Sequence, residues 1–269
     1  MPERNYMNIL DTIIREKELE IKNKKLEMSI SGLEKSNFFK RKTLSLKKFL
    51  LDENKTGIIA EFKRKSPSKG IINGNADVIE ITSAYADNGA SALSVLTDEK
   101  FFGGTAYDLI KARVNEIPIL RKDFIIDEYQ IAEAKSIGAD IILLIAACLS
   151  PQQVKTLAKF AKNLELEVLL ELHAEEELEH ICDETEIVGI NNRNLKTFEV
   201  DIERSLRMAE KIPSDKIKVA ESGISSVENI NLFKQHGFRG FLIGENFMKE
   251  KNPAIAFASF VNKLKTVSS

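Results

Sequence analysis

Eight short apolar runs, each followed by a segment with helical periodicity, occupy the sequence from residue 57 onward. The apolar runs lie at 57–60, 92–96, 117–120, 140–145, 166–170, 187–190, 217–220 and 240–243. The helical segments lie at 78–88, 106–115, 128–137, 151–163, 174–182, 202–211, 227–236 and 253–264. Strands and helices that alternate with short connections indicate a parallel sheet. Eight such units predict an α/β fold, namely a closed (β/α)8 TIM barrel.

An open, doubly wound parallel sheet is the alternative fold, but no G-x-G-x-x-G segment follows the first apolar run. The N-terminal part of the chain has a different pattern. Apolar residues between 9 and 14 repeat at helical spacing among charged residues, which predicts an amphipathic helix, and 44–51 predicts a further short helix. We therefore expect a single barrel domain over residues 1–269, of which residues 1–56 form an N-terminal helical extension.

The charge balance, the cysteines and the histidines argue against several classes of partner and site. The 39 basic residues nearly cancel the 41 acidic ones, so neither nucleic acid nor an anionic membrane is expected as a partner. Cys148 and Cys182 form no C-x-x-C pair and are expected to be reduced core thiols. Because His173, His180 and His236 are scattered along the chain, we expect no metal site, and no motif indicates a cofactor.

The apolar segments of the chain do not resemble targeting or membrane segments. The N-terminus has no apolar stretch of secretory type. The longest apolar run, 141–149, is too short to cross a bilayer. A cytoplasmic protein that acts on a small molecule is the expectation.

The segment 57–70 joins the first apolar run to a polar turn. Glu61 and Lys63 are two residues apart, so on a strand both side chains point to the same side. The Ser-Pro-Ser sequence at 66–68 then ends the strand. An acid and an amine where a buried strand meets its loop are typical of active sites in parallel α/β proteins. A salt bridge at the end of a strand would give the same pattern.

Ionisable residues follow other apolar runs as well. Lys122 follows the third run, Glu171 the fifth and Glu221 the seventh. Because the carboxyl ends of barrel strands meet at one face, two lysines and three glutamates are expected to converge there and to shift one another's pKa values. Each residue alone is compatible with a loop salt bridge. The recurrence of all five at strand ends favours an active site.

A separate pattern, after the last two runs, is typical of a phosphate site. Ser222 and Gly223 follow the seventh run, and Gly244 follows the eighth, just before a short helical segment at 245–248. At this position of a barrel, backbone N–H groups and a helix N-terminus bind a phosphate dianion. Tight turns are the structural alternative for these glycines.

Six segments, in order, resemble those of the indole-3-glycerol phosphate synthase family of tryptophan biosynthesis. The most specific is Ala60-Glu-Phe-Lys-Arg-Lys-Ser-Pro-Ser-Lys-Gly70. The others lie at 96–104, 120–124, 170–171, 189–195 and 220–224. The resemblance covers nearly the whole chain, including the N-terminal extension.

This resemblance implies a carbon–carbon lyase. The implied reaction closes the ring of 1-(2-carboxyphenylamino)-1-deoxyribulose 5-phosphate to indole-3-glycerol phosphate, with loss of carbon dioxide and water. Lys122 would protonate the developing alkoxide, Lys63 would pair with the substrate carboxylate and help eject hydroxide, and Glu171 would be the general base. Glu61 would orient the lysines. The implied catalytic residues are Glu61, Lys63, Lys122, Glu171, Asn191 and Ser222.

The resemblance also implies three groups of substrate contacts. The phosphate would be held by Ser66, Gly223, Gly244 and the backbone N–H of Glu245. The anthranilate ring would contact Phe102, Phe124 and Leu195. The substrate hydroxyls and carboxylate would bind Asn191 and Glu221, next to Arg193. In this family the N-terminal helices partly cover the barrel mouth, and a monomer is expected.

One residue departs from the family pattern, and two other readings remain open. Because some members carry a small polar residue where this chain has Glu245, we expect that carboxylate to turn to solvent. A phosphoribosylanthranilate isomerase-like barrel has a cysteine on its first strand in place of Glu61 and Lys63. A non-catalytic phosphosugar-binding barrel would tolerate the loss of Lys122 or Glu171, and both are present.

Overall fold

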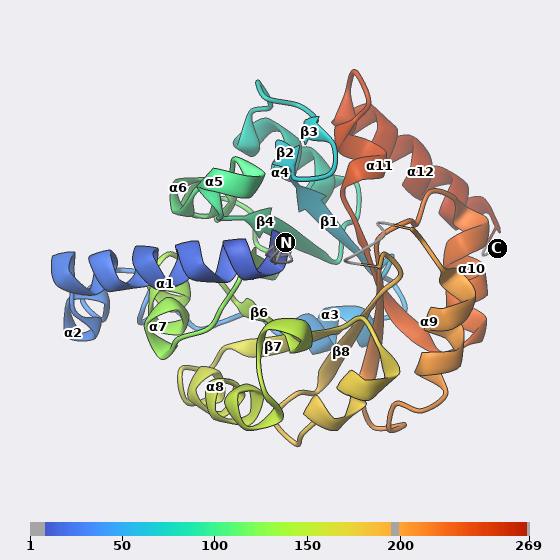
Figure 1. Ribbon diagram of the computed structural model, residues 1–269. Helices are drawn as coiled ribbons and strands as arrows, with labels where there is room; N and C mark the ends of the chain where they lie inside the picture. Colours follow the sequence, from blue (N-terminus) through green and yellow to red (C-terminus); the bar gives the residue numbers. More distant parts are fainter. Residues whose placement is uncertain (1–8, 195–198, 268–269) are drawn as a thin grey trace, which may run out of the picture.

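A closed barrel of eight parallel strands forms the centre of the molecule (Figure 1). The computed structural model describes residues 9–194 and 199–267. The strands pair in chain order, and the last one pairs with the first to close the barrel. They are β1 (Ile58–Phe62), β4 (Ala92–Leu96), β5 (Ile119–Lys122), β6 (Ile141–Ile145), β7 (Glu167–Leu172), β8 (Ile187–Asn191), β9 (Ile217–Glu221) and β10 (Phe238–Ile243). The predicted (β/α)8 barrel is confirmed.

Helices cover the outside of the barrel between successive strands (Figure 1). They are α4 (Val78–Asp87), α6 (Ala106–Ala112), α7 (Glu128–Ser136), α8 (Pro151–Asn163), α9 (Ile202–Ala209), α10 (Val227–Gln235) and α12 (Pro253–Val267). Capping residues set where several of them begin. Ser150 and Gln153 form a capping box at the start of α8, where Pro151 occupies the first helical position.

The α-helix predicted over 174–182 is wrong, because this connection is a 3-10 helix, η2 (Glu175–His180). The Glu177 carboxylate turns back and accepts hydrogen bonds from the backbone N–H groups of His173 and Ala174, at 2.5 and 3.2 Å. The ring of His180 is buried, with Nε2 2.8 Å from the carbonyl oxygen of Leu149. These contacts hold the short connection in a tighter winding than an α-helix.

Short elements follow several strands at their carboxyl ends. They are β2 (Lys65–Ser66) and β3 (Gly70–Ile71) after β1, α5 (Glu99–Phe102) after β4, η1 (Ala146–Cys148) after β6 and α11 (Glu245–Met248) after β10. The short helix predicted over 245–248 is confirmed. These elements form the rim of the barrel mouth.

From residue 9 onward, three helices precede the barrel, namely α1 (Ile9–Glu27), α2 (Ile30–Leu33) and α3 (Leu46–Leu51). Leu46 and Leu50 of α3 are buried against the inward-facing residues of the barrel strands. Lys47 of α3 pairs with Glu186, the residue before β8, so α3 closes the amino end of the barrel. In Figure 1, α1 starts near the middle of the barrel and runs outward past α7.

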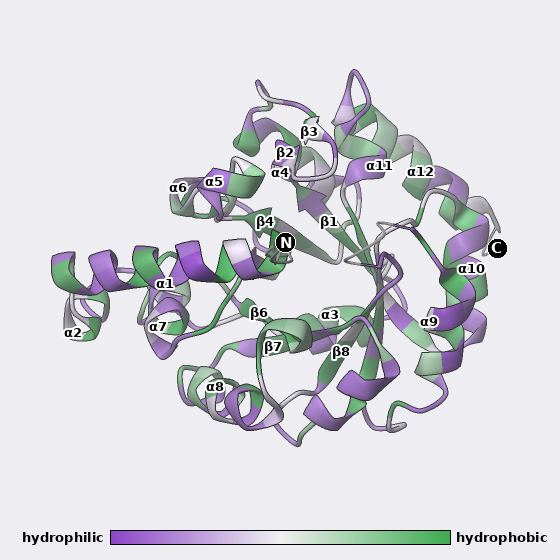
Figure 2. Cartoon of the chain, in the orientation of Figure 1, coloured by the Kyte–Doolittle hydropathy of each residue, from purple (hydrophilic) through white to green (hydrophobic). Residues whose placement is uncertain are grey.

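Residues of each strand alternate between two hydrophobic layers. On β1, Ile58, Ala60 and Phe62 pack outward against the helices, whereas Ile59 faces the barrel interior. Figure 2 shows the strands as mostly hydrophobic, and the outer helices as a mixture of hydrophobic and hydrophilic residues. This alternation decides which side chains at the strand ends point into the barrel.

Two further expectations concern the cysteines and membrane segments. Cys148 and Cys182 are both free thiols, as predicted, but they are half-buried, and Cys148 packs against the hydrophobic core. Over residues 9–194 and 199–267, no helix combines the length and the apolar character that a membrane crossing needs.

Candidate active site

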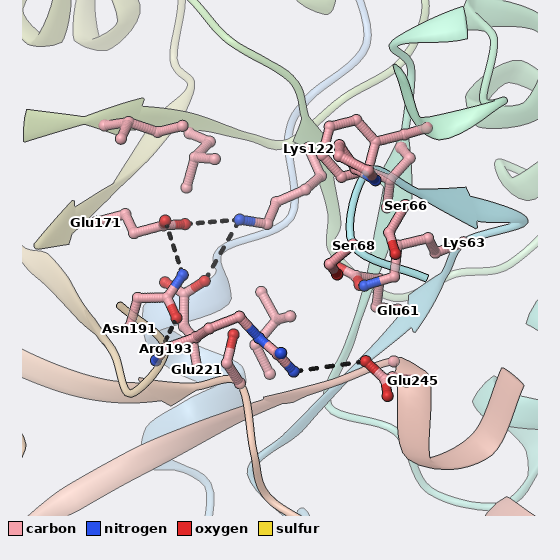
Figure 3. A pocket seen from close by; sticks show the side chains of 18 of the residues that line it. Glu61, Lys63, Ser66, Ser68, Lys122, Glu171, Asn191, Arg193, Glu221 and Glu245 are labelled. Carbon is pink, nitrogen blue, oxygen red and sulfur yellow. Dashed lines mark hydrogen bonds and ion pairs between the residues drawn. The ribbon is translucent and has the colours of Figure 1, made fainter. Parts of the chain in front are cut away.

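A cavity of about 300 Å³ opens at the carboxyl ends of the barrel strands (Figure 3). The predicted site residues that line it are Glu61, Lys63, Ser66, Phe102, Lys122, Phe124, Glu171, Asn191, Arg193, Glu221, Ser222, Gly223, Gly244 and Glu245. The predicted contact Leu195 lies outside the described residues. The cavity is also lined by Ile9, Leu10 and Ile13 of α1, so the N-terminal extension forms part of its wall.

The strand alternation points the ionisable side chains into this cavity. Several strands continue past the apolar run that predicted them, so Glu61, Lys122, Glu171, Asn191 and Glu221 are strand residues and not loop residues. On β7, Leu169 faces the barrel interior and Leu170 faces the helices, which places Glu171 on the inward side. The same alternation holds on β9 for Val219, Ala220 and Glu221.

Lys122 lies between two buried carboxyl groups. Its Nζ is 2.6 Å from Oε2 of Glu171 and 3.4 Å from Oε2 of Glu221 (Figure 3). Asn191 donates a hydrogen bond from Nδ2 to the other oxygen of Glu171, at 3.0 Å. Asn191 and Glu221 are register partners on β8 and β9, so strand pairing places these two residues side by side.

These contacts push the pKa values of the two carboxyl groups apart. Burial alone would raise the pKa of Glu171, but the Lys122 ammonium and His173 outweigh burial and hold it well below its usual range. Burial raises the pKa of Glu221 well above its usual range, and the neighbouring Glu171 carboxylate raises it further. Burial alone would lower the pKa of Lys122, but Glu171 and Glu221 outweigh burial and raise it. These contacts therefore make Glu171 the stronger acid of the pair and Glu221 the weaker one.

Two glycines make room for the buried glutamates. A Cβ atom at Gly189 would lie 2.1 Å from Oε1 of Glu221. A Cβ atom at Gly244 would lie 2.5 Å from Oε1 of Glu61. Neither position has space for a larger residue unless the carboxyl group moves.

Lys63 forms a second amine–carboxylate pair. Its Nζ is 2.6 Å from Oε1 of Glu61, as the two-residue spacing predicts. Ser94 donates a longer hydrogen bond to the other oxygen of Glu61, at 3.4 Å. In Figure 3, Lys63 lies beside Glu61, whereas Lys122 reaches across to Glu171 and Glu221. The cavity lining therefore contains Lys63 paired with one carboxyl group, Glu61, and Lys122 paired with two, Glu171 and Glu221.

One corner of the cavity is built of backbone turns. Ser222 and Gly223 both have left-handed backbone conformations, with φ of +66° and +70°. Gly244 lies beside them in the cavity wall and directly precedes α11. Successive left-handed residues and a helix start expose backbone N–H groups, which is the arrangement that binds anions.

The expectation that Glu245 turns its carboxylate to solvent is wrong. Its Oε2 lies 3.5 Å from Nη2 of Arg193, and its Oε1 lies 3.9 Å from Nζ of Lys69. The side chain is 35 % exposed. Two cations therefore attract the carboxylate, and in Figure 3 it lies close to the start of α11 while the side chain of Arg193 extends toward it.

Part of the cavity wall is apolar. The rings of Phe102 and Phe124 have centroids 6.1 Å apart, with 37° between their planes. Together with Ile9, Leu10 and Ile13 of α1 they form a surface that an aromatic ring can contact.

The sequence analysis assigned no role to His173. Its Nε2 lies 3.0 Å from Oε1 of Glu171, and its ring is buried in the cavity wall. The signal was available, because His173 is two residues beyond Glu171 and so points to the same side. Among the described residues, no group of three or more histidine, cysteine or acidic side chains is arranged to hold a metal ion.

Comparisons with known proteins identify the family of this chain. The family model for indole-3-glycerol phosphate synthase matches residues 10–260. Indole-3-glycerol phosphate synthase of Bacteroides thetaiotaomicron is 48% identical over 258 residues, which cover 96% of this chain and 99% of that protein. The enzyme of the same name from Polaromonas naphthalenivorans is 46% identical over 206 residues, or 76% of this chain and 78% of that protein.

Solved structures at low sequence identity share the fold alone. KGPDC from Streptococcus mutans aligns with a TM-score of 0.59 at 15% identity, covering 79% of this chain and 98% of that one. A chain of the tryptophan synthase complex from Pyrococcus furiosus aligns with a TM-score of 0.58 at 17% identity, covering 79% and 99%. The match to the family model and the identity to its members show that this chain belongs to the indole-3-glycerol phosphate synthase family.

Proposed function

We propose that this chain closes the ring of 1-(2-carboxyphenylamino)-1-deoxyribulose 5-phosphate to give indole-3-glycerol phosphate, carbon dioxide and water, in tryptophan biosynthesis. The observation that carries the proposal is the position of Lys122 between Glu171, whose pKa is lowered, and Glu221, whose pKa is raised. In this proposal Glu171 is ionised and Glu221 is protonated. This group of residues supplies a proton donor and a proton acceptor inside one cavity.

Lys122 is the acid of the first step in this proposal. The ring carbon that bears the carboxylate attacks the ketone carbon of the sugar, and negative charge develops on the ketone oxygen. Lys122 gives that oxygen a proton, so a hydroxyl group forms. The carboxylate then leaves as carbon dioxide, and the electron pair of the broken bond restores the aromatic ring.

Lys63 and Glu171 act mainly in the dehydration. Lys63 pairs with the substrate carboxylate before it is lost, and then helps the new hydroxyl leave as water. Glu171 takes the proton that the adjacent sugar carbon must lose to form the indole double bond. Once Lys122 has donated its proton, the main cause of the low pKa of Glu171 is gone, so Glu171 becomes a stronger base.

The remaining cavity residues bind the substrate in this proposal. Asn191 and Glu221 contact its hydroxyl and carboxylate groups. Ser222 is the last of the six proposed catalytic residues, after Glu61, Lys63, Lys122, Glu171 and Asn191. The phosphate occupies the corner formed by Ser66, Gly223, Gly244 and the backbone N–H of Glu245, next to Arg193. The ring lies against Phe102 and Phe124. A monomeric state and a cytoplasmic location stay predictions.

The test is a direct assay of the purified chain. Mixing it with the carboxyphenylamino deoxyribulose phosphate should produce indole fluorescence, with carbon dioxide released in equal amount. Intact substrate after prolonged incubation would contradict the proposal. In a parallel reaction, phosphoribosylanthranilate should remain unchanged, and its isomerisation would favour the sister activity instead.

A further inference from the structure

Lys17 is a buried lysine in the middle of the apolar face of α1. Ile13, Lys17 and Ile21 are the buried residues of that helix, and they are spaced four apart, so they share one face. Lys17 is 1% exposed. Lysine is almost never buried to this extent unless its charge is paired. The partners of Lys17 therefore show what this face of α1 is built to contact.

Two of those partners are aspartates on the barrel rim. The Nζ of Lys17 lies 2.9 Å from Oδ2 of Asp98 and 2.9 Å from Oδ1 of Asp123. Glu20, on the same helix, lies 2.8 Å away. Burial alone would lower the pKa of Lys17, but these acids outweigh burial and raise it, so the group is an ammonium at any physiological pH.

Asp98 positions the aromatic residue Phe102. Asp98 is the N-cap of α5, and its Oδ1 accepts a hydrogen bond from the backbone N–H of Phe101 at 2.7 Å. Phe102 is the last residue of the same short helix and lines the cavity. Because α5 has only one turn, its orientation depends strongly on this cap.

Asp123 lies in the chain between two cavity residues, Lys122 and Phe124. Its Oδ1 accepts the backbone N–H of Phe124 at 2.9 Å, and its Oδ2 accepts a hydrogen bond from Thr97 at 2.6 Å. Asp123 thus links the loop after β4 to the end of β5. Lys17 of α1 contacts Asp123 directly, so α1 is connected to both of these barrel segments.

One helical turn before Lys17, α1 itself reaches the cavity. Ile13 lines the cavity, as do Ile9 and Leu10 at the start of the helix. The apolar wall is therefore assembled from three separate segments, namely α1, α5 and the end of β5. The ammonium group of Lys17 contacts acids from the two barrel segments at once.

We propose that Lys17 is a positioning residue for the reaction, because its ion pairs with Asp98 and Asp123 hold α1 and the aromatic residues of the cavity as one unit. This role rests on the proposed function and deepens it. A buried ion pair that served stability alone would leave the cavity unchanged when removed from a protein that still folds. A positioning residue alters the contact between the apolar wall and the substrate ring.

The test compares Lys17→Met with Lys24→Met in the full-length protein. Lys24 is also on α1 and pairs with Glu133 at 2.8 Å, but it contacts neither Asp98 nor Asp123. Lys17→Met should raise KM for the carboxyphenylamino substrate about tenfold, while kcat changes by less than about threefold, because the wall contacts ground state and transition state alike. Lys17→Arg should restore most of the affinity, and Lys24→Met should leave KM unchanged.

Amide hydrogen exchange of the ligand-free proteins gives a second readout that needs no substrate. In Lys17→Met, exchange should rise together in α1 and in residues 98–104, and it should stay unchanged in α3 at the other end of the barrel. In Lys24→Met, residues 98–104 should keep the exchange rates of the unaltered protein. If exchange in Lys17→Met rose in only one of these two segments, α1 or residues 98–104, the proposal would be overturned.

Asp98→Asn keeps the proposal testable if Lys17→Met does not fold. Asparagine caps a helix as well as aspartate does, so α5 keeps its cap, while an amide NH2 group, which cannot accept a hydrogen bond, replaces the carboxylate oxygen that faces Lys17. KM for the carboxyphenylamino substrate should rise in Asp98→Asn, as it should in Lys17→Met. A KM unchanged in every variant, in a protein whose unaltered form turns over the substrate, would overturn the role of Lys17. No turnover by the unaltered protein would instead overturn the proposed function itself.

Discussion

Glu171 and Glu221 contact the same ammonium group, and yet their pKa values are shifted in opposite directions. Glu171 lies closer to Nζ of Lys122, at 2.6 Å against 3.4 Å for Glu221. Its pKa is held well below the usual range, whereas burial and the Glu171 carboxylate raise the pKa of Glu221 well above it. Two carboxyl groups that share one cation in a buried site cannot both ionise at low cost.

The two glutamates should respond differently to replacement by glutamine, which imitates a protonated glutamate. Glu221→Gln preserves the uncharged state, so kcat should fall by less than about tenfold. Glu171→Gln removes the proton acceptor, so kcat should fall by about 100-fold or more. Steady-state kinetics at neutral pH, with circular dichroism to verify folding, measure both. The reverse order of the two losses would contradict the assignment of charge.

Lys122→Ala should abolish ring closure while substrate binding persists. The proton of Lys122 is needed mainly as charge develops on the ketone oxygen, so kcat should fall about 1,000-fold. The Kd for the substrate, measured by titration, should change far less. Lys47→Ala is the matched control, because Lys47 also pairs with a glutamate, at the opposite end of the barrel. A loss of binding in parallel with rate would argue against this role.

Glu245→Gln should strengthen substrate binding. The Glu245 carboxylate pairs with Arg193 beside the proposed phosphate corner, where it repels a phosphate and competes for the guanidinium. KM should fall about threefold, since one charge at a partly exposed site changes binding free energy by about 1 kcal/mol or less. The difference should shrink at high salt.

Glu250→Gln is the control for Glu245→Gln, because Glu250 is exposed just beyond the end of α11. It removes the same charge near the same helix without removing a contact to Arg193. Equal effects of the two substitutions would show that net charge alone is responsible.

Acid should destabilise the protein through Asp123. Burial alone would raise the pKa of Asp123, but Arg121 and Lys17 outweigh burial and lower it to about 2. Because the folded-state pKa lies below the unfolded value, the unfolded state binds more protons in this range. The stabilisation is therefore complete above the ordinary pKa of 3.8 and is lost as pH falls toward 2.

Urea unfolding between pH 5 and pH 2 measures this effect. The unaltered protein should lose about 2 kcal/mol of unfolding free energy through this group alone. Asp123→Asn should be less stable at pH 5 and should lose less on acidification. A pH dependence that is equal in both proteins would show that other carboxyl groups account for it.

The sequence by itself determined the barrel and the location of the site. Eight repeats of apolar run and helical segment favour a parallel sheet that closes, and a closed parallel sheet brings its carboxyl strand ends to one face. Residues that follow the apolar runs, such as Glu61 and Lys122, could therefore be assigned to one site from their positions in the chain. The short segment after β7 was mistaken for an α-helix because side-chain contacts of Glu177 and His180 override its periodicity.

Only the tertiary structure decided the pKa shifts and the contacts between residues that are far apart in the sequence. The pKa of Glu221 depends on groups that come from β5 and β7, and no local pattern encodes those distances. In the same way, Lys17 looks like a solvated residue of a charged helix until Asp98 and Asp123 are placed opposite it. The orientation of the Glu245 carboxylate likewise depends on a residue far away in the sequence, Arg193. Electrostatic interactions act through space, so they follow from the folded positions of the groups and not from their order in the chain.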